Sequence, residues 1–131
     1  RLRFVTTTDT EEIVLRVPAR AAYARIVRIG AAAIALRVGM TFTEIDDLRL
    51  AIDEALIALL DGDGRTEGDL QVIYRVSAGR FELEASRDDG GPVSGDAVDR
   101  FDEIAATLVD DYDIDTARGW LRIRKATTDE G

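Results

Sequence analysis

The sequence predicts an α+β fold, a two-layer sandwich in which helices pack on one face of a mixed or antiparallel sheet. Strand and helix patterns follow in the order strand, helix, helix, hairpin, helix, hairpin, so the two types are segregated rather than alternating. The 131 residues are the usual size of one domain, and 46% hydrophobic with 33% charged residues is typical of a folded globular protein. We therefore expect one domain over residues 1–131, with its core at about residues 12–125.

Charge and residue usage exclude several classes of function. With 26 acidic and 17 basic residues, the formal charge of −9 disfavours nucleic acid and anionic membrane surfaces. The absence of cysteine and histidine removes thiol nucleophiles, imidazole bases and most transition-metal sites. No apolar run approaches the ~20 residues that span a bilayer, and the first residues lack the apolar core of a signal peptide. We therefore expect a cytoplasmic protein whose partners are proteins or small molecules.

The first part of the chain is predicted to hold a strand and a long helix. Residues 12–17 (EIVLRV) alternate apolar and polar side chains before Pro18, while residues 2–7 are either a companion strand or a lead-in. Helix formers fill residues 19–38, and Gly39 is placed to stop the helix. Its predicted buried face is Tyr23, Ile26, Val27, Ala31, Ile34 and Val38. Its exposed arginines are Arg20, Arg25, Arg28 and Arg37. They are either solvated helix charges or a docking surface for an acidic partner.

A second helix is predicted from Thr43 to Asp63, with Thr43 as N-cap and Asp46 completing a pattern like a capping box. Its apolar residues recur at steps of three and four: Leu48, Ile52, Ala55, Leu56 and Leu59. A second stripe lies beside this apolar face and holds Asp47, Glu54, Ala58 and Asp61. We expect any chemistry to lie along this second stripe.

The second half of the chain is predicted to hold two hairpins around a third helix. Residues 70–77 and 80–86 alternate and are joined by Ala78-Gly79, which predicts the first hairpin. Its predicted core face is Val72, Tyr74, Val76, Phe81, Leu83 and Ala85. Residues 97–111 have the pattern of an amphipathic helix, and YDIDT and GWLRIRKA that of two strands. The final TTDEG is expected to fray.

Residues 48–60 (LRLAIDEALIALL) resemble the first ATP-binding motif of the anti-sigma-factor serine kinases, which belong to the histidine-kinase-like GHKL ATPases of the Bergerat fold. That motif reads approximately L-x-L-A-V-D-E-A-x-x-N-A. The matching positions are Leu48, Leu50, Ala51, Asp53, Glu54 and Ala55. Ala58 stands where the family has its magnesium-binding asparagine, so the sequence offers no metal ligand there. The family's fold agrees with the α+β sandwich that the element order predicts.

The resemblance implies roles for three residues. Glu54 would be the catalytic carboxylate that orients or deprotonates the nucleophile near the γ-phosphate. The residues alone leave Asp53 as an equal candidate, and a solvated helix carboxylate as the plain alternative. Residues 87–92 (RDDGGP) fall at the family's second motif, R-D-x-G-x-G, in which Asp88 would accept a hydrogen bond from adenine and Gly90 would let the backbone approach it. Pro92 replaces the second glycine, and a plain turn explains the segment equally well.

The family's phosphate-binding loop has no counterpart here. GDAVDRFDEIA occupies its place, where Asp96, Asp99 and Asp102 add negative charge and Arg100 alone adds positive charge. We therefore expect ATP and Mg²⁺ binding to be weakened or lost, with no firm cofactor. The resemblance implies a sigma factor and an anti-anti-sigma protein of the STAS type as partners, and homodimers. We interpret the chain as an anti-sigma-like regulator; the alternatives are an active serine kinase that uses Glu54, and an interaction domain of an unrelated regulator.

Overall fold

The structure, a computed structural model, describes residues 10–60, 68–88 and 95–128. Its strands are β1 (Glu11–Pro18), β2 (Asp69–Ser77), β3 (Arg80–Arg87), β4 (Asp111–Asp115) and β5 (Trp120–Ala126). Its helices are α1 (Ala24–Val38), α2 (Phe42–Leu60) and α3 (Gly95–Leu108), and a 3₁₀ turn, η1 (Ala21–Tyr23), precedes α1. The strands pair in the order β1-β2-β3-β5-β4, and every pairing among the described residues is antiparallel.

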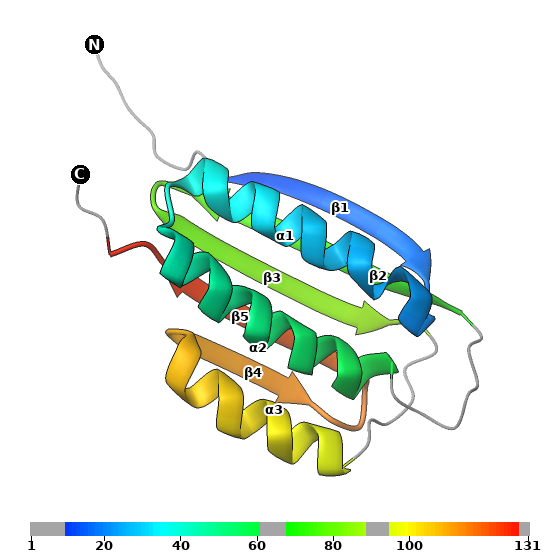
Figure 1. Cartoon of the computed structure of the whole chain (residues 1–131). Coiled ribbons are helices and arrows are strands. Elements are labelled where there is room, and N and C mark those ends of the chain that lie inside the picture. The colour runs from blue at the N-terminus through cyan, green and yellow to red at the C-terminus, as the bar shows by residue number, and fades with distance from the viewer. Residues whose placement is uncertain (1–9, 61–67, 89–94, 129–131) are drawn as a thin grey trace.

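The helices form one layer on one face of the sheet, with α2 between α1 and α3 (Figure 1). The sheet buries alternate side chains against this layer: Leu70, Val72, Tyr74, Val76, Phe81, Leu83, Ala85, Leu121 and Ile123. The predicted α+β sandwich is therefore confirmed. In the part of the chain that the structure describes, no helix combines the length and apolar character needed to cross a membrane.

The β2–β3 hairpin is confirmed in its register and its turn. Val72 pairs with Ala85, and Tyr74 with Leu83, so the residues predicted to share a core face do so. Gly79 takes a φ of 69° in the connecting turn, a left-handed conformation that glycine adopts at little cost. Tyr74 also fixes the sheet to α1, because its hydroxyl donates to the Val27 carbonyl over 2.8 Å.

The predicted buried face of α1 is wrong at one residue. Ile26 is 47% exposed, and so are Ile29 (60%) and Leu36 (59%), whereas Val27, Ala31 and Ala35 are fully buried. The helix has a second apolar side that faces away from the sheet, so its hydrophobic spacing alone could not say which residues are covered. The predicted stop is confirmed: Gly39 is left-handed with a φ of 101°, and its N–H caps the Ala35 and Leu36 carbonyls.

The predicted cap of α2 is wrong. The helix begins at Phe42, and the capping residue is Thr41 rather than Thr43. The Glu44 N–H donates to Thr41 Oγ1 over 3.1 Å, and the Thr41 N–H donates to Glu44 Oε1 over 2.9 Å. This is a complete capping box. The longer glutamate side chain reaches back to the cap, so the Thr41–Glu44 pair prevails over the overlapping Thr43–Asp46 pair.

The ends of the chain's last elements also differ from the prediction. The third helix stops at Leu108 instead of Asp111, because Asp111 pairs with Arg124 in the β4–β5 ladder. Thr127 and Thr128, expected to fray, hydrogen-bond to the rest of the molecule. Residues 2–7, expected to be either a companion strand or a lead-in, lie outside the described residues, as does the segment 61–63 of the predicted second helix.

The open face of the sheet carries a row of alternating charge that crosses all five strands. Along the paired positions, Glu12 lies beside Arg75, Arg75 beside Glu82, Glu82 beside Arg124, and Arg124 beside Asp111. Each neighbouring pair forms an ion pair of 2.7–3.2 Å. Arg75 also contacts Glu84 over 2.8 Å, and hydrogen bonds, that to Glu12 first, raise the pKa of its guanidinium.

Candidate functional site

The two adjacent carboxylates of α2 lie on different sides of the helix. Asp53 faces α1, where its Oδ1 lies 3.3 Å from Arg28 Nε. Glu54 shares the opposite side with Ala58, one turn further on, toward α3. Glu54 Oε1 is buried and has no hydrogen-bond donor among the described residues. Asp53 Oδ1 is also buried without a hydrogen-bond donor among the described residues, but it has the Arg28 cation beside it. A buried carboxylate oxygen needs a donor, so Glu54 is the better placed of the two to accept one from a ligand.

Ala58 is fully buried, with an exposed fraction of 0%. It lies on the side of α2 that packs against α3, whose own buried residues include Phe101 and Ala105. The position at which the resembling family carries a metal-binding amide is therefore filled by a methyl group in a closed helix contact. Among residues 10–60, 68–88 and 95–128, no group of three or more acidic side chains could hold a metal ion.

Asp88 follows the end of β3, and its carboxylate is held by neighbouring strands. Oδ1 accepts the Asp69 N–H over 3.0 Å, and Oδ2 lies 3.5 Å from Arg16 Nη1. The preceding residue, Arg87, turns to the helix layer instead and donates to the Leu59 carbonyl near the end of α2 over 3.1 Å. The chain just before Asp88 thus contacts the last turn of α2, whereas the Asp88 carboxylate itself contacts β1 and β2. Gly90 lies outside the described residues.

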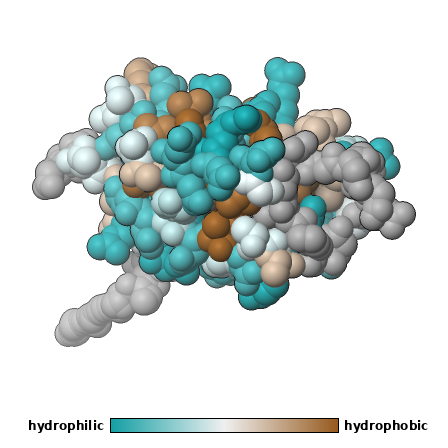
Figure 2. Space-filling view, turned by 90° about the horizontal axis from the view of Figure 1, so that it is seen from below, coloured by the Kyte–Doolittle hydropathy of each residue, from teal (hydrophilic) through white to brown (hydrophobic). Residues whose placement is uncertain are grey.

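The start of α3 carries exposed acids. Asp96 is in the first turn, Asp99 is one turn on, and both are exposed, as is Arg100. Carboxylates near a helix N-terminus stabilise the helix, which is a sufficient structural reason for Asp96. Seen from the side on which α3 lies, the described surface is mostly hydrophilic, with small separate apolar patches (Figure 2).

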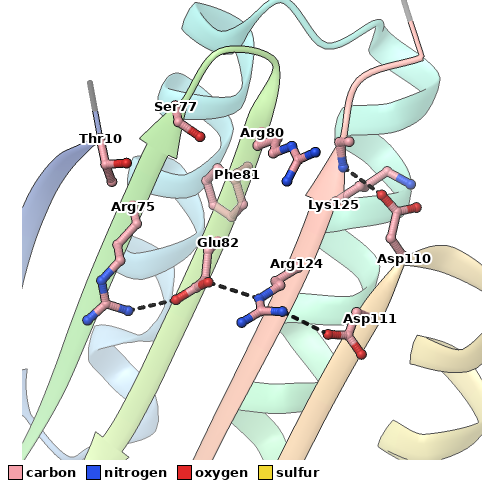
Figure 3. A pocket seen from close by; sticks show the side chains of 11 residues that line it. Thr10, Arg75, Ser77, Arg80, Phe81, Glu82, Asp110, Asp111, Arg124 and Lys125 are labelled. Carbon is pink, nitrogen blue, oxygen red and sulfur yellow. Dashed lines mark hydrogen bonds and ion pairs between the residues drawn. The ribbon is translucent and has the colours of Figure 1, made fainter. Parts of the chain in front are cut away.

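A hollow of about 630 Å³ lies on the other side of the sheet, near the β2–β3 turn (Figure 3). Its floor is the charged row, from Arg75 through Glu82 and Arg124 to Asp111, and Arg80 stands at its rim. The floor charges satisfy one another, and of the residues expected to bind nucleotide, the two that the structure describes, Glu54 and Asp88, do not line this hollow. The size of the hollow alone therefore does not make it the nucleotide site.

Glu44 is a buried residue whose role was missed from the sequence. It is 8% exposed, and it is the one charged side chain that is buried in the described part of the chain. Hydrogen bonds, first from the Thr128 hydroxyl and then from the Thr41 and Thr128 backbones, lower its pKa from 4.5 to about 2. The T-x-x-E spacing of Thr41 and Glu44 was a visible signal for the cap, whereas the contact with Thr128 joins residues too distant in the sequence to be read from it.

Comparison with known proteins places these residues in a family context. No protein-family model matches the chain. The serine-protein kinase RsbW of Bacillus cereus (strain B4264) is 30% identical over 77 residues, covering 58% of this chain and 48% of the relative. RsbW of Halalkalibacterium halodurans is 29% identical over 96 residues, covering 65% of this chain and 59% of the relative. RsbW of Bacillus thuringiensis (strain Al Hakam) is 28% identical over 74 residues, or 56% of this chain.

The matched region spans about half the length of these relatives. The α2 motif, the α+β sandwich and the repeated similarity to serine-protein kinases agree with one another. The resemblance stated from the sequence is confirmed at this level: over the matched region the chain is similar to RsbW serine-protein kinases.

Proposed function

We propose that this chain acts as an anti-sigma-like regulator that binds a sigma factor, a STAS-type anti-anti-sigma protein, or both, with nucleotide binding weakened or lost. The observation that carries the loss of nucleotide is the burial of Ala58 at the family's asparagine position. A methyl group supplies no oxygen to Mg²⁺, which binds proteins through oxygen ligands and keeps several waters. The exposed Asp96 and Asp99 at the start of α3 add repulsion toward phosphate.

The first prediction is weak or undetectable binding of Mg-ATP and Mg-ADP by isothermal titration calorimetry. Each unfavourable contact costs on the order of 1–3 kcal/mol, so together they remove several decades of affinity. Glu54→Gln is the matched variant, because it keeps the side-chain shape while it removes the charge. Submicromolar binding by the unaltered chain, abolished in Glu54→Gln, would overturn the proposed loss of nucleotide.

The alternative function is an active serine kinase that phosphorylates a STAS-type protein. The observation in its favour is Glu54, whose buried Oε1 has no hydrogen-bond donor among the described residues. Incubation with labelled ATP and a STAS protein separates this alternative from the binding protein, since only a kinase transfers label.

The exposed side of α1 is the surface that we propose for the partner. Ile26, Ile29 and Leu36 lie along one side of the helix at steps of three and seven residues, where they cover no part of the sheet. Arg25 and Arg37 stand beside them and are also exposed. Apolar side chains flanked by cations in a chain of net charge −9 favour a partner that presents apolar residues with acidic neighbours.

One residue of the predicted docking surface must be reassigned. Arg28 is 37% exposed and forms an ion pair with Asp53 of α2. Its reversal would place two carboxylates together and disturb the α1–α2 contact, so a loss of partner binding in that variant could not be assigned to the docking surface. Arg20 and Arg37 are exposed and suit that purpose.

The second prediction is that Arg20→Glu and Arg37→Glu slow association with the partner by about 10-fold, chiefly through the on-rate and most strongly at low salt. Surface plasmon resonance against a sigma factor and a STAS protein at two ionic strengths provides the measurement. Arg100→Glu, on α3, is the matched control, since Arg100 is exposed and α2 lies between α3 and α1. Glu54→Ala should leave binding unchanged. Loss of binding in Glu54→Ala, with both reversals silent, would favour the kinase.

A further inference from the structure

The carboxylate of Glu44 joins two parts of the chain that are 83 and 84 residues apart. Its helical partner is Thr41, which shares the capping box described above. Its other donors come from the end of the chain after β5. Thr127 Oγ1 donates to Oε1 over 3.1 Å, while the Thr128 N–H and hydroxyl donate to Oε2 over 2.8 and 2.6 Å. More than half of the donors to this buried charge therefore come from two consecutive threonines.

Thr127 extends the contact to two turns. Its N–H donates to the Gly79 carbonyl in the β2–β3 turn over 2.9 Å, and its hydroxyl also lies 3.3 Å from the Gly39 carbonyl in the α1–α2 connection. Thr127 and Thr128, with Glu44 as their acceptor, thus fasten the end of β5 to the connection between α1 and α2. We call this set of contacts the C-terminal latch.

The chemistry of the latch allows it to open without leaving Glu44 unsatisfied. The donors that the structure shows on its carboxylate are neutral hydroxyl and backbone groups. When the threonines leave, the carboxylate gains contact with water and keeps its bond to the Thr41 N–H. The Glu44 charge is stabilised by neutral hydrogen-bond donors when the latch is closed and by water when the latch is open. A contact can switch between two states only if its polar groups are satisfied in both of them.

We propose that Thr127 and Thr128 form a releasable latch on Glu44, and that opening this latch loosens the α1–α2 connection together with the first turn of α2. A regulatory consequence follows that rests on the proposed function. Because Gly39 ends α1, the latch also steadies the helix that carries the proposed partner surface. A modification or partner that draws the end of the chain away from Glu44 would weaken partner binding on α1.

Substitutions at Thr128 test the latch, with hydrogen exchange measured by mass spectrometry on peptides that cover residues 40–46, residues 124–128 and strand β3. Thr128→Val keeps the side-chain shape but removes the hydroxyl donor, and Thr128→Glu places a second carboxylate against Glu44. Thr128→Ser retains the donor and should behave as the unaltered chain. Thr107→Val is the matched control, because the Thr107 hydroxyl donates to a carbonyl of its own helix, Ile104.

We expect exchange in residues 40–46 to rise about 10-fold in Thr128→Val and more in Thr128→Glu, with β3 unchanged, since a hydrogen bond to a charged group contributes about one to two decades. A rise confined to residues 124–128 would overturn the proposal, because the latch would then open without loosening α2. An equal rise in β3 would also overturn it, by showing a role in overall stability alone.

The regulatory consequence has its own readout. With the partner bound in surface plasmon resonance, Thr128→Glu should raise the dissociation rate by about 3–10-fold, whereas Thr128→Ser should not. If exchange rises as expected but dissociation does not change, the latch stands and its control of the α1 surface is refuted. If the unaltered chain binds neither a sigma factor nor a STAS protein, the proposed function fails, while the exchange result still decides the latch.

Discussion

Glu44→Gln should lower the free energy of unfolding at neutral pH by about 2–4 kcal/mol. The glutamine amide removes the charge that the Thr41 and Thr128 donors stabilise, and its N–H₂ group must face a donor at one of the two oxygen positions. Urea denaturation of both proteins measures the difference. Glu103→Gln, an exposed change on α3, is the matched control and should stay within ~0.5 kcal/mol of the unaltered chain.

The same difference should depend on pH in a defined window. The pKa of Glu44 is lowered from 4.5 to about 2, so its contribution to stability is complete above pH 4.5 and is lost as the pH falls toward 2. The free energy of unfolding of the unaltered chain should therefore approach that of Glu44→Gln below pH 4.5. From pH 5 to 7 the difference between the two free energies should stay constant. A difference that is unchanged down to pH 2 would show that the shape of the side chain, and not its charge, stabilises the fold.

Ala58→Asn should destabilise the protein by about 2–4 kcal/mol and should not create a kinase. The larger amide must enter a fully buried position in the α2–α3 contact, where it would displace packed side chains and need hydrogen-bond partners of its own. Thermal or urea unfolding gives the stability, and labelled ATP with a STAS protein gives the activity.

Ala106→Asn separates this packing effect from helix propensity, since Ala106 is exposed on α3 and the same change there should cost only about 0.5–0.7 kcal/mol. Equal losses in the two variants would argue that Ala58 is not packed as the structure has it. Robust phosphotransfer by Ala58→Asn would show that the acids at the start of α3 matter less to phosphate binding than we propose.

Local patterns in the sequence predict most of the fold. The alternation in residues 70–77 and 80–86 fixes the faces of the hairpin, because a shift of one residue would turn Tyr74 and Phe81 toward solvent, and the short Ala78-Gly79 turn sets its register. The apolar residues of α2 recur at steps of three and four, so they lie on one side of the helix, and this spacing places that side in the core. Spacing cannot tell which of two apolar sides is covered, and so Ile26 was assigned to the wrong side of α1.

The candidate site is less accessible to sequence reasoning. A motif places Glu54 on α2 and Asp88 at the end of a strand, and both positions agree with the structure. The direction of the Asp88 carboxylate depends on Asp69 and Arg16, which reach it only through strand pairing. The contact of Glu44 with Thr128 likewise forms only when β5 has joined the sheet. The roles of Glu54, Asp88 and Gly90 stay predictions.

The row of alternating charge on the open face favours one register for each pair of neighbouring strands. The core side of the sheet is mainly apolar, so a strand displaced by two residues would still bury hydrophobic side chains and would lose little there. On the open face β3 and β5 pair Glu82 with Arg124 and Glu84 with Arg122. A displacement of β5 by two residues against β3 would leave Arg124 opposite either Arg80 or Glu84, so only one of the two charged pairs could form. Glu82 and Arg75 are only 21% and 28% exposed, which limits screening by salt. The row thereby disfavours misaligned sheets during folding. Concentrated salt during refolding should therefore raise the yield of trapped, aggregating chains at salt concentrations that do not yet lower the stability of the folded protein.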